Sequence, residues 1–154
     1  MRKTSAWRWR NVPLPEPHLI GLGVGILLQV LTPWRLAWPA WSRYGFGWPM
    51  IVAGLWLVAW AVRAAADVDL ERPNQLVRKG PYAFSGNPMY LAWTLAYVGI
   101  ASIVNTAWPL LLLPAVLLLT HVAIVREERS LEGRFGTAYR GYKTSARRYL
   151  QGRP

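Results

Sequence analysis

Four long apolar runs are the feature that most limits what this chain of 154 residues can fold into. They cover residues 19–36, 48–66, 89–104 and 107–125, and few side chains within them are polar. As helices, runs of about 16–19 residues span roughly 24–29 Å, which is close to the thickness of a bilayer core. We therefore expect an all-α integral membrane protein with about four transmembrane helices. A soluble bundle of very apolar helices is the less favoured alternative, because one small domain cannot hide four such runs.

The basic side chains are distributed unevenly between the connections. The formal net charge is +11, and most cations lie before the first run, between the second and third runs, or after the fourth. The connection between the first two runs holds only Arg35 and Arg43. This positive-inside pattern predicts a multi-pass protein of the inner (cytoplasmic) membrane with both termini in the cytoplasm. It also explains the charge through contact with anionic lipid, so we expect no nucleic-acid partner.

The chain divides into segments of one membrane domain, 1–154. Residues 1–17 form a basic interfacial tail in which Trp7 and Trp9 alternate with Arg8 and Arg10. The first two spans (18–66), a polar loop (67–88), two more spans (89–125) and a cytosolic segment (126–154) follow. Glycines at 21, 23 and 25 in the first span suit close helix packing within or between chains.

The loop 67–88 is long and has no clear period, which is typical of a functional segment. Its Gly80-Pro81 and Asn87-Pro88 pairs are turn signals, and Pro88 suits the first turn of the next helix, with Asn87 at the N-cap. The last apolar run can continue as a helix to Phe135, with Gly136 as a stop and Thr137 starting another helix. Each feature also has a purely structural explanation when it is taken alone.

The expected C-terminal helix is amphipathic. Its apolar stripe consists of Leu131, Phe135, Tyr139, Tyr142, Ala146, Tyr149 and Leu150. Basic residues lie between these positions, so the helix is expected either on the inner membrane surface or folded against the core.

A combination of motifs resembles a known family. Leu76-Val77-x-x-Gly80-Pro81-Tyr82 is followed by Asn87-Pro88-Met89-Tyr90, and after a hairpin of spans by Glu127-Glu128-x-x-Leu131-x-x-x-Phe135-Gly136-x-x-Tyr139-x-x-Tyr142. This order resembles the isoprenylcysteine carboxyl methyltransferases, which are related to the phospholipid N-methyltransferases. The resemblance implies a membrane methyltransferase that uses S-adenosylmethionine and acts on a lipophilic or amphiphilic acceptor arriving from the bilayer. Methylation of a carboxylate is favoured, with methylation of a phospholipid or other amine, or of a thiol, as alternatives.

The resemblance also implies site residues by position. Gln75, Leu76, Val77 and Tyr82 would line the cofactor site on the cytosolic side. Asn87, Pro88, Met89 and Tyr90 would form the turn that grips the cofactor, and Glu127, supported by Glu128, would bind its ribose or amino-acid part. The chemistry agrees, because carboxylates suit a diol or an ammonium, and tyrosines can stack on adenine or face a sulfonium.

Two further residues are candidates for the catalytic step. His121 is an ionisable group inside the fourth run, where it could act as a base or bind the acceptor, or could be a neutral structural histidine. The other candidate is Arg126.

The chain departs from the family pattern at two places. Many relatives carry Arg-His where this chain has Gly86-Asn87. Eukaryotic relatives place a substrate-binding arginine where this chain has Ala123, which leaves Arg126 as the nearby cation.

Two functions of other classes compete with the enzyme. A proton-coupled transporter subunit would need a carboxylate within a span, and none of the four runs contains Asp or Glu. A non-enzymatic membrane scaffold gives no reason for the ordered motifs. We expect no metal site, because two histidines, no cysteine and scattered carboxylates offer no ligand spacing.

Overall fold

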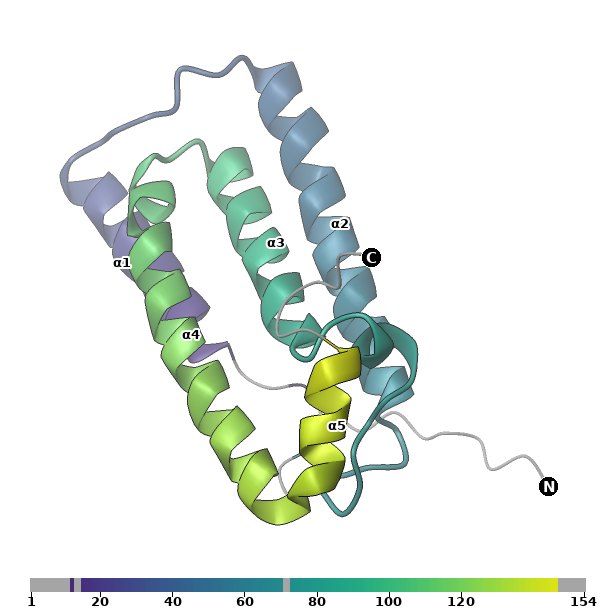
Figure 1. The fold of residues 1–154 in the computed structure, drawn as a ribbon. Coiled ribbons are helices and arrows are strands. Elements are labelled where there is room, and N and C mark those ends of the chain that lie inside the picture. The colour runs from purple at the N-terminus through teal and green to yellow at the C-terminus, as the bar shows by residue number, and fades with distance from the viewer. Residues whose placement is uncertain (1–11, 13–14, 71–72, 147–154) are drawn as a thin grey trace.

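The computed structural model describes residues 12, 15–70 and 73–146, and it is built from helices (Figure 1). In chain order these are α1 (Glu16–Leu31), α2 (Ala40–Ala64), the short 3-10 helix η2 (Gly80–Ala83), α3 (Pro88–Val104), α4 (Trp108–Phe135) and α5 (Thr137–Ser145). The described part of the chain contains no strand, which confirms the predicted all-α class.

Two helices, α2 and α4, are long and apolar enough to cross a bilayer, with 25 and 28 residues. Only 28% and 22% of their apolar windows are buried inside the protein, whereas the core helix of a soluble protein would be mostly buried. This outward apolar surface suits lipid. Helices α1 and α3 are also apolar but have only 16 and 17 residues. The prediction of four transmembrane helices is thus supported for two of them.

The first predicted span extends beyond the end of α1, and the second begins later than α2 does. Helix α1 ends at Leu31 rather than at residue 36, because Pro33 offers no backbone N–H and disfavours helical geometry in the residue before it. Helix α2 starts at Ala40, well before the predicted residue 48. Pro39 precedes this helix in an extended conformation, and Pro49 is accommodated inside it.

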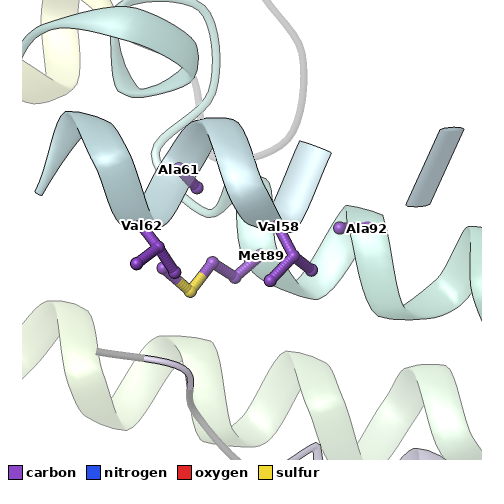
Figure 2. Packing of buried hydrophobic residues seen from close by; sticks show 5 residues of the cluster. All are labelled: Val58, Ala61, Val62, Met89 and Ala92. Carbon is purple, nitrogen blue, oxygen red and sulfur yellow. The ribbon is translucent and has the colours of Figure 1, made fainter. Parts of the chain in front are cut away.

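Helices α2 and α3 form the most extensive pair, and glycine lets their backbones touch. A Cβ atom added to Gly54 would lie 2.6 Å from the Ala92 carbonyl oxygen, and one added to Gly99 would lie 2.7 Å from the Gly47 carbonyl oxygen. At the other end of this seam, small and medium apolar side chains interlock (Figure 2). They are Val58, Ala61, Val62, Met89 and Ala92. Close packing of small residues is the usual way for helices to associate in lipid.

Helices α1 and α4 form a second, antiparallel pair (Figure 1). A Cβ atom added to Gly25 would lie 2.6 Å from Pro109, and one added to Gly21 would collide with Val116. Gly23 has open space around its Cα atom. Two of the three glycines in the first span therefore serve packing within the chain.

The predicted helix stop at Gly136 is confirmed. Helix α4 ends at Phe135, Gly136 has φ 51° and ψ −122°, and α5 starts at Thr137. Helix α5 folds back against the core, the second of its two expected placements. Its buried residues Tyr139, Tyr142 and Ala146 pack with Leu76, Leu131 and Phe135. The basic tail 1–11 and the stripe residues Tyr149 and Leu150 lie outside the described residues.

Candidate functional site

The two polar clusters of the sequence meet at one end of the bundle. Tyr90 lies in the first turn of α3, and Glu127 lies on α4 just beyond its apolar part. A short turn with Asn105 at φ 60° makes α3 and α4 an antiparallel hairpin, so the start of one lies beside the end of the other. The Tyr90 hydroxyl donates a hydrogen bond to Glu127 Oε2 over 3.3 Å.

A narrow cavity of about 60 Å³ opens beside this contact. Half of the ten predicted cofactor residues line it, namely Gln75, Leu76, Val77, Tyr82 and Glu127. Its lining also includes Leu131 of α4 and Tyr139 and Tyr142 of α5. The loop before α3 and the segment after the last apolar run therefore enclose one space.

Two more cavities adjoin the first. One, of about 80 Å³, is lined by Glu128 and Lys143 and shares Gly86, Tyr139 and Tyr142 with the first cavity. The other, of about 360 Å³, is also lined by Gln75, Leu76 and Val77 and extends to Ala64 at the end of α2. The segment 75–77 thus borders two hollows.

Contacts with the loop before α3 hold helix α5 over the cavity. The Tyr142 hydroxyl donates to the Tyr82 carbonyl oxygen over 2.7 Å, and Arg78 Nη2 donates to the Ala138 carbonyl oxygen over 2.8 Å. The Arg78 guanidinium also lies over the Tyr142 ring, 5.9 Å from its centroid. Each of the two hydrogen bonds joins residues that are 60 positions apart in the chain.

The two glutamates have different surroundings. Glu128 is buried, and Lys143 Nζ lies 3.4 Å from its Oε2 atom. The Glu127 side chain stays exposed as a whole, yet protein atoms crowd its carboxyl group. This desolvation raises the pKa of Glu127, the charge of Glu128 raises it further, and the hydrogen bond from Tyr90 opposes the rise. A carboxyl group with a raised pKa beside a cavity is a candidate for a functional role.

Three predicted cofactor residues lie deeper than the cavities. Asn87, Pro88 and Met89 are buried at the start of α3, and Met89 packs into the α2–α3 core (Figure 2). Asn87 occupies the N-cap position, but its side chain makes no capping hydrogen bond. Its backbone N–H donates to Ser85 Oγ over 3.1 Å. These residues shape the turn beneath the site, and their contact with a cofactor stays a prediction.

The two predicted catalytic residues are not among those that line these three cavities. His121 is half-buried and Arg126 is exposed. Successive helical residues turn by about 100°, so both point in other directions than Glu127. Their roles remain predictions.

Sequence reasoning missed His18, which is buried in the first turn of α1 with 2% of its surface exposed. Its Nε2 atom lies 3.0 Å from Oγ1 of Thr94, and Thr94 lies one turn beyond Tyr90 on α3. The available signal was an ionisable residue at the very edge of an apolar run.

Together, the fold and the site define a helical membrane protein with a candidate binding cavity at the polar end of its bundle. Residues 42–138, more than half of the chain, match the family model described as phospholipid methyltransferase. The chain therefore belongs to this family, which is related to the isoprenylcysteine carboxyl methyltransferases, and the resemblance seen in the sequence is confirmed. Membership implies a methyl-transferring enzyme. No curated protein and no solved structure matches the chain.

Proposed function

We propose that this protein is an S-adenosylmethionine-dependent methyltransferase that methylates the amine headgroup of a membrane lipid. The observation that carries the proposal is the contact between Tyr90 and Glu127, because it joins the two halves of the motif beside one cavity. Both residues lie within the stretch that matches the phospholipid methyltransferase family.

The residues around the cavity suit the chemistry of the cofactor. S-adenosylmethionine supplies an electrophilic methyl group on a sulfonium. The Glu127 carboxylate can accept hydrogen bonds from a ribose diol or pair with an ammonium. The rings of Tyr82, Tyr139 and Tyr142 offer faces for adenine or for a cation.

The space beside the two glutamates is smaller than such a ligand needs, whereas the adjoining cavity along Gln75, Leu76 and Val77 measures about 360 Å³. Ligand sites commonly have volumes of about 300–1,000 Å³, whereas the cavities beside Glu127 and Glu128 measure about 60 and 80 Å³. Helix α5 follows a glycine and covers both cavities. We therefore propose that α5 moves outward when the cofactor enters and then closes over it. Closure would exclude water and fix the reacting atoms in line, which supplies much of the acceleration in methyl transfer.

An amine acceptor fits the charges better than the carboxylate that the family resemblance favours. The Glu127 carboxylate would attract an ammonium group and repel a carboxylate. Two cations near the cavity already have partners, because Lys143 is paired with Glu128, and Arg78 is bonded to the Ala138 carbonyl oxygen. A thiol would gain nothing specific from Glu127.

The end of the bundle that carries Glu127 is proposed to face the cytoplasm across the inner membrane, as the positive-inside pattern predicts. The chain has no cysteine, so single cysteines can report this directly. Lys79→Cys, at the Glu127 end, should react with a membrane-impermeant maleimide only in inverted vesicles. Arg35→Cys, in the connection between α1 and α2, should react in intact cells. The reverse pattern would overturn the orientation.

The central test is binding of S-adenosylhomocysteine to the detergent-purified protein by calorimetry. Wild type and Glu16→Ala, which alters an exposed carboxylate in α1, should bind alike, whereas Glu127→Ala should bind weakly. Transfer of a radiolabelled methyl group to phosphatidylethanolamine, with a prenylcysteine as the competing acceptor, then distinguishes amine from carboxylate. Folded protein that binds neither S-adenosylhomocysteine nor S-adenosylmethionine would overturn the proposed function.

A further inference from the structure

A buried histidine of α1, which the proposed chemistry has not used so far, packs against α3. The His18 ring packs edge-on against Tyr97 of α3, with ring centroids 5.9 Å apart. Its Nε2 atom is 3.0 Å from Thr94 Oγ1, while its buried Nδ1 atom has no hydrogen-bond partner among the described residues. A buried polar atom without a partner is costly, so it calls for an explanation.

The hydrogen bonds of Thr94 fix the protonation of this ring. The Thr94 hydroxyl donates its only proton to the Tyr90 carbonyl oxygen over 2.9 Å. Towards His18 it can therefore only accept, so Nε2 carries the ring proton and donates. It follows that Nδ1 of the neutral ring is unprotonated, and no described residue donates a hydrogen bond to its lone pair.

A second unsatisfied group lies at the same level of the bundle. The Gly25–Pro109 and Gly21–Val116 contacts set the register of the antiparallel helices α1 and α4. From the Gly21–Val116 contact towards the Glu127 end, His18 is about one turn further along α1 and Thr120 is one turn further along α4. Thr120 Oγ1 is buried and also lacks a partner among the described residues. Within the part of the chain that the structure describes, α1 and α4 thus each carry a buried side-chain atom without a hydrogen-bond partner.

This level is close to the candidate cofactor site. Thr94 follows Tyr90 by one turn of α3, and Tyr90 bonds to Glu127. A chain of contacts therefore runs from His18 through Thr94 and Tyr90 to Glu127. His18 is level with Thr94, so it lies closer to the middle of the bundle than the Tyr90–Glu127 pair does. The lipid acceptor would approach the pair from this direction.

We propose that His18 and Thr120 form the subsite for the reacting amine of the lipid acceptor, with His18 Nδ1 as the atom that takes its proton. This inference rests on the proposed function and names the residues that would handle the acceptor. The N–H bond of the lipid ammonium breaks and its proton forms the Nδ1–H bond. The freed nitrogen lone pair forms the new N–C bond, while the C–S electron pair stays on sulfur as a neutral thioether. The proton later passes from Nδ1 to water.

Among the described residues, the titratable groups on the elements around His18 are few, and on α4 they include His121, the neighbour of Thr120. From α3 these are Tyr97, in ring contact, and Tyr90, whose carbonyl oxygen belongs to the same chain of hydrogen bonds. On α4 the described partner at this level is Thr120, which does not titrate, and Glu127 lies about two turns further along. Glu16 shares the first turn of α1 but is exposed.

The direct test is nitrogen-15 NMR of histidine-labelled full-length protein in micelles. Only two histidines exist, so His121→Gln assigns both signals. With S-adenosylhomocysteine bound, the His18 ring should be the Nε2–H tautomer. A short-chain phosphatidylethanolamine should shift the Nδ1 signal, whereas the matched phosphatidylcholine, which has no N–H, should not. A protonated Nδ1 in the free protein, or no response to the ethanolamine lipid, would overturn the proposal.

Two variants distinguish proton acceptance by His18 from a purely structural link between α1 and α3. His18→Gln keeps an amide N–H near the Nε2 position, for Thr94, but removes the proton acceptor. Thr94→Val removes the hydrogen bond between Thr94 and His18 but keeps the imidazole. His18→Gln should lower kcat for phosphatidylethanolamine about 100-fold and abolish the acidic limb of the pH profile, with unchanged KM for S-adenosylmethionine. Thr94→Val should retain that limb.

The outcomes distinguish this inference from the proposed function. If His18→Gln behaves as wild type and Thr94→Val loses activity, His18 is a structural link and the proposal fails. If S-adenosylhomocysteine binds but phosphatidylethanolamine is neither methylated nor able to shift Nδ1, the subsite is wrong while the cofactor assignment stands. If His18→Gln does not fold, the NMR result on the folded protein decides.

Discussion

Tyr90 and Glu127 are 37 positions apart in the chain, yet the hydroxyl of one donates to the carboxylate of the other over 3.3 Å. The hydrogen bond crosses from the first turn of α3 to the part of α4 beyond its apolar run. It forms because the turn at Asn105 closes the hairpin at the opposite end. The proposed cofactor site therefore depends on the register of two helices as much as on the identity of the two residues.

Removing this carboxylate should weaken cofactor binding without unfolding the protein. A hydrogen bond to a charged group contributes about 1.5–3 kcal/mol, so Glu127→Ala should raise the dissociation constant for S-adenosylhomocysteine roughly 10- to 100-fold. Calorimetry measures this, with Glu16→Ala as the control for loss of an exposed carboxylate. Equal affinity of Glu127→Ala and wild type would remove Glu127 from the site.

The raised pKa of Glu127 predicts a specific pH dependence of stability. At acid pH the carboxyl group is protonated in folded and unfolded chains, so it contributes no pH dependence. As pH rises through the usual carboxyl range, the unfolded chain loses its proton first, so wild type is destabilised until the folded-state pKa is passed. Glu127→Gln lacks this penalty. The thermal midpoint of Glu127→Gln minus that of wild type should therefore increase from acid to neutral pH. A difference that does not change with pH would contradict the raised pKa of Glu127.

The glycine seam between α2 and α3 can be tested with a pair of variants on one helix. A Cβ atom at Gly54 would meet backbone atoms of α3, whereas one at Gly45 would meet nothing within 4 Å. Gly54→Ala should therefore lose about 1–3 kcal/mol of stability through overpacking. Gly45→Ala should be neutral or stabilising by up to about 1 kcal/mol, because alanine favours the helix. Thermal unfolding in detergent compares them, and similar midpoints would argue against backbone contact at the seam.

The backbone of Gly136 gives a second matched pair. A Cβ atom meets nothing within 4 Å at either Gly133 or Gly136, but only Gly136 has a positive φ, of 51°. Gly136→Ala should thus introduce strain of about 1–3 kcal/mol and loosen α5, while Gly133→Ala should not. Hydrogen exchange of the α5 amides is the measurement. If exchange in α5 is the same in both variants, the glycine is not needed for the reversal of the chain.

Much of the fold followed from local signals in the sequence. The Gly136 stop, Pro88 in the first turn of α3 and the short turn at Asn105 depend on the conformational limits of single residues, which a sequence displays directly. Hydropathy predicts that the first span continues to residue 36, but α1 ends at Leu31, two residues before Pro33. Hydropathy reports the solvent around a segment, whereas proline acts on the backbone itself.

The site was harder to predict, because it depends on contacts between helices. The motif positions Gln75, Val77, Tyr82 and Glu127 do line one cavity. Met89, from the same motif, packs instead against α2. His18 could not be related to Tyr90 from the sequence, because their connection runs through the register of α1 against α3.

The position of α5 in the chain also affects how the protein is made. Synthesis proceeds from the N-terminus, so α1 to α4 leave the ribosome before Tyr139 and Tyr142 do. These two rings form a wall of the cavity at Glu127. A nascent chain whose apolar helices are already in the bilayer therefore still lacks that wall. If the proposed cofactor site is right, binding of the cofactor would have to wait until α5 has been made.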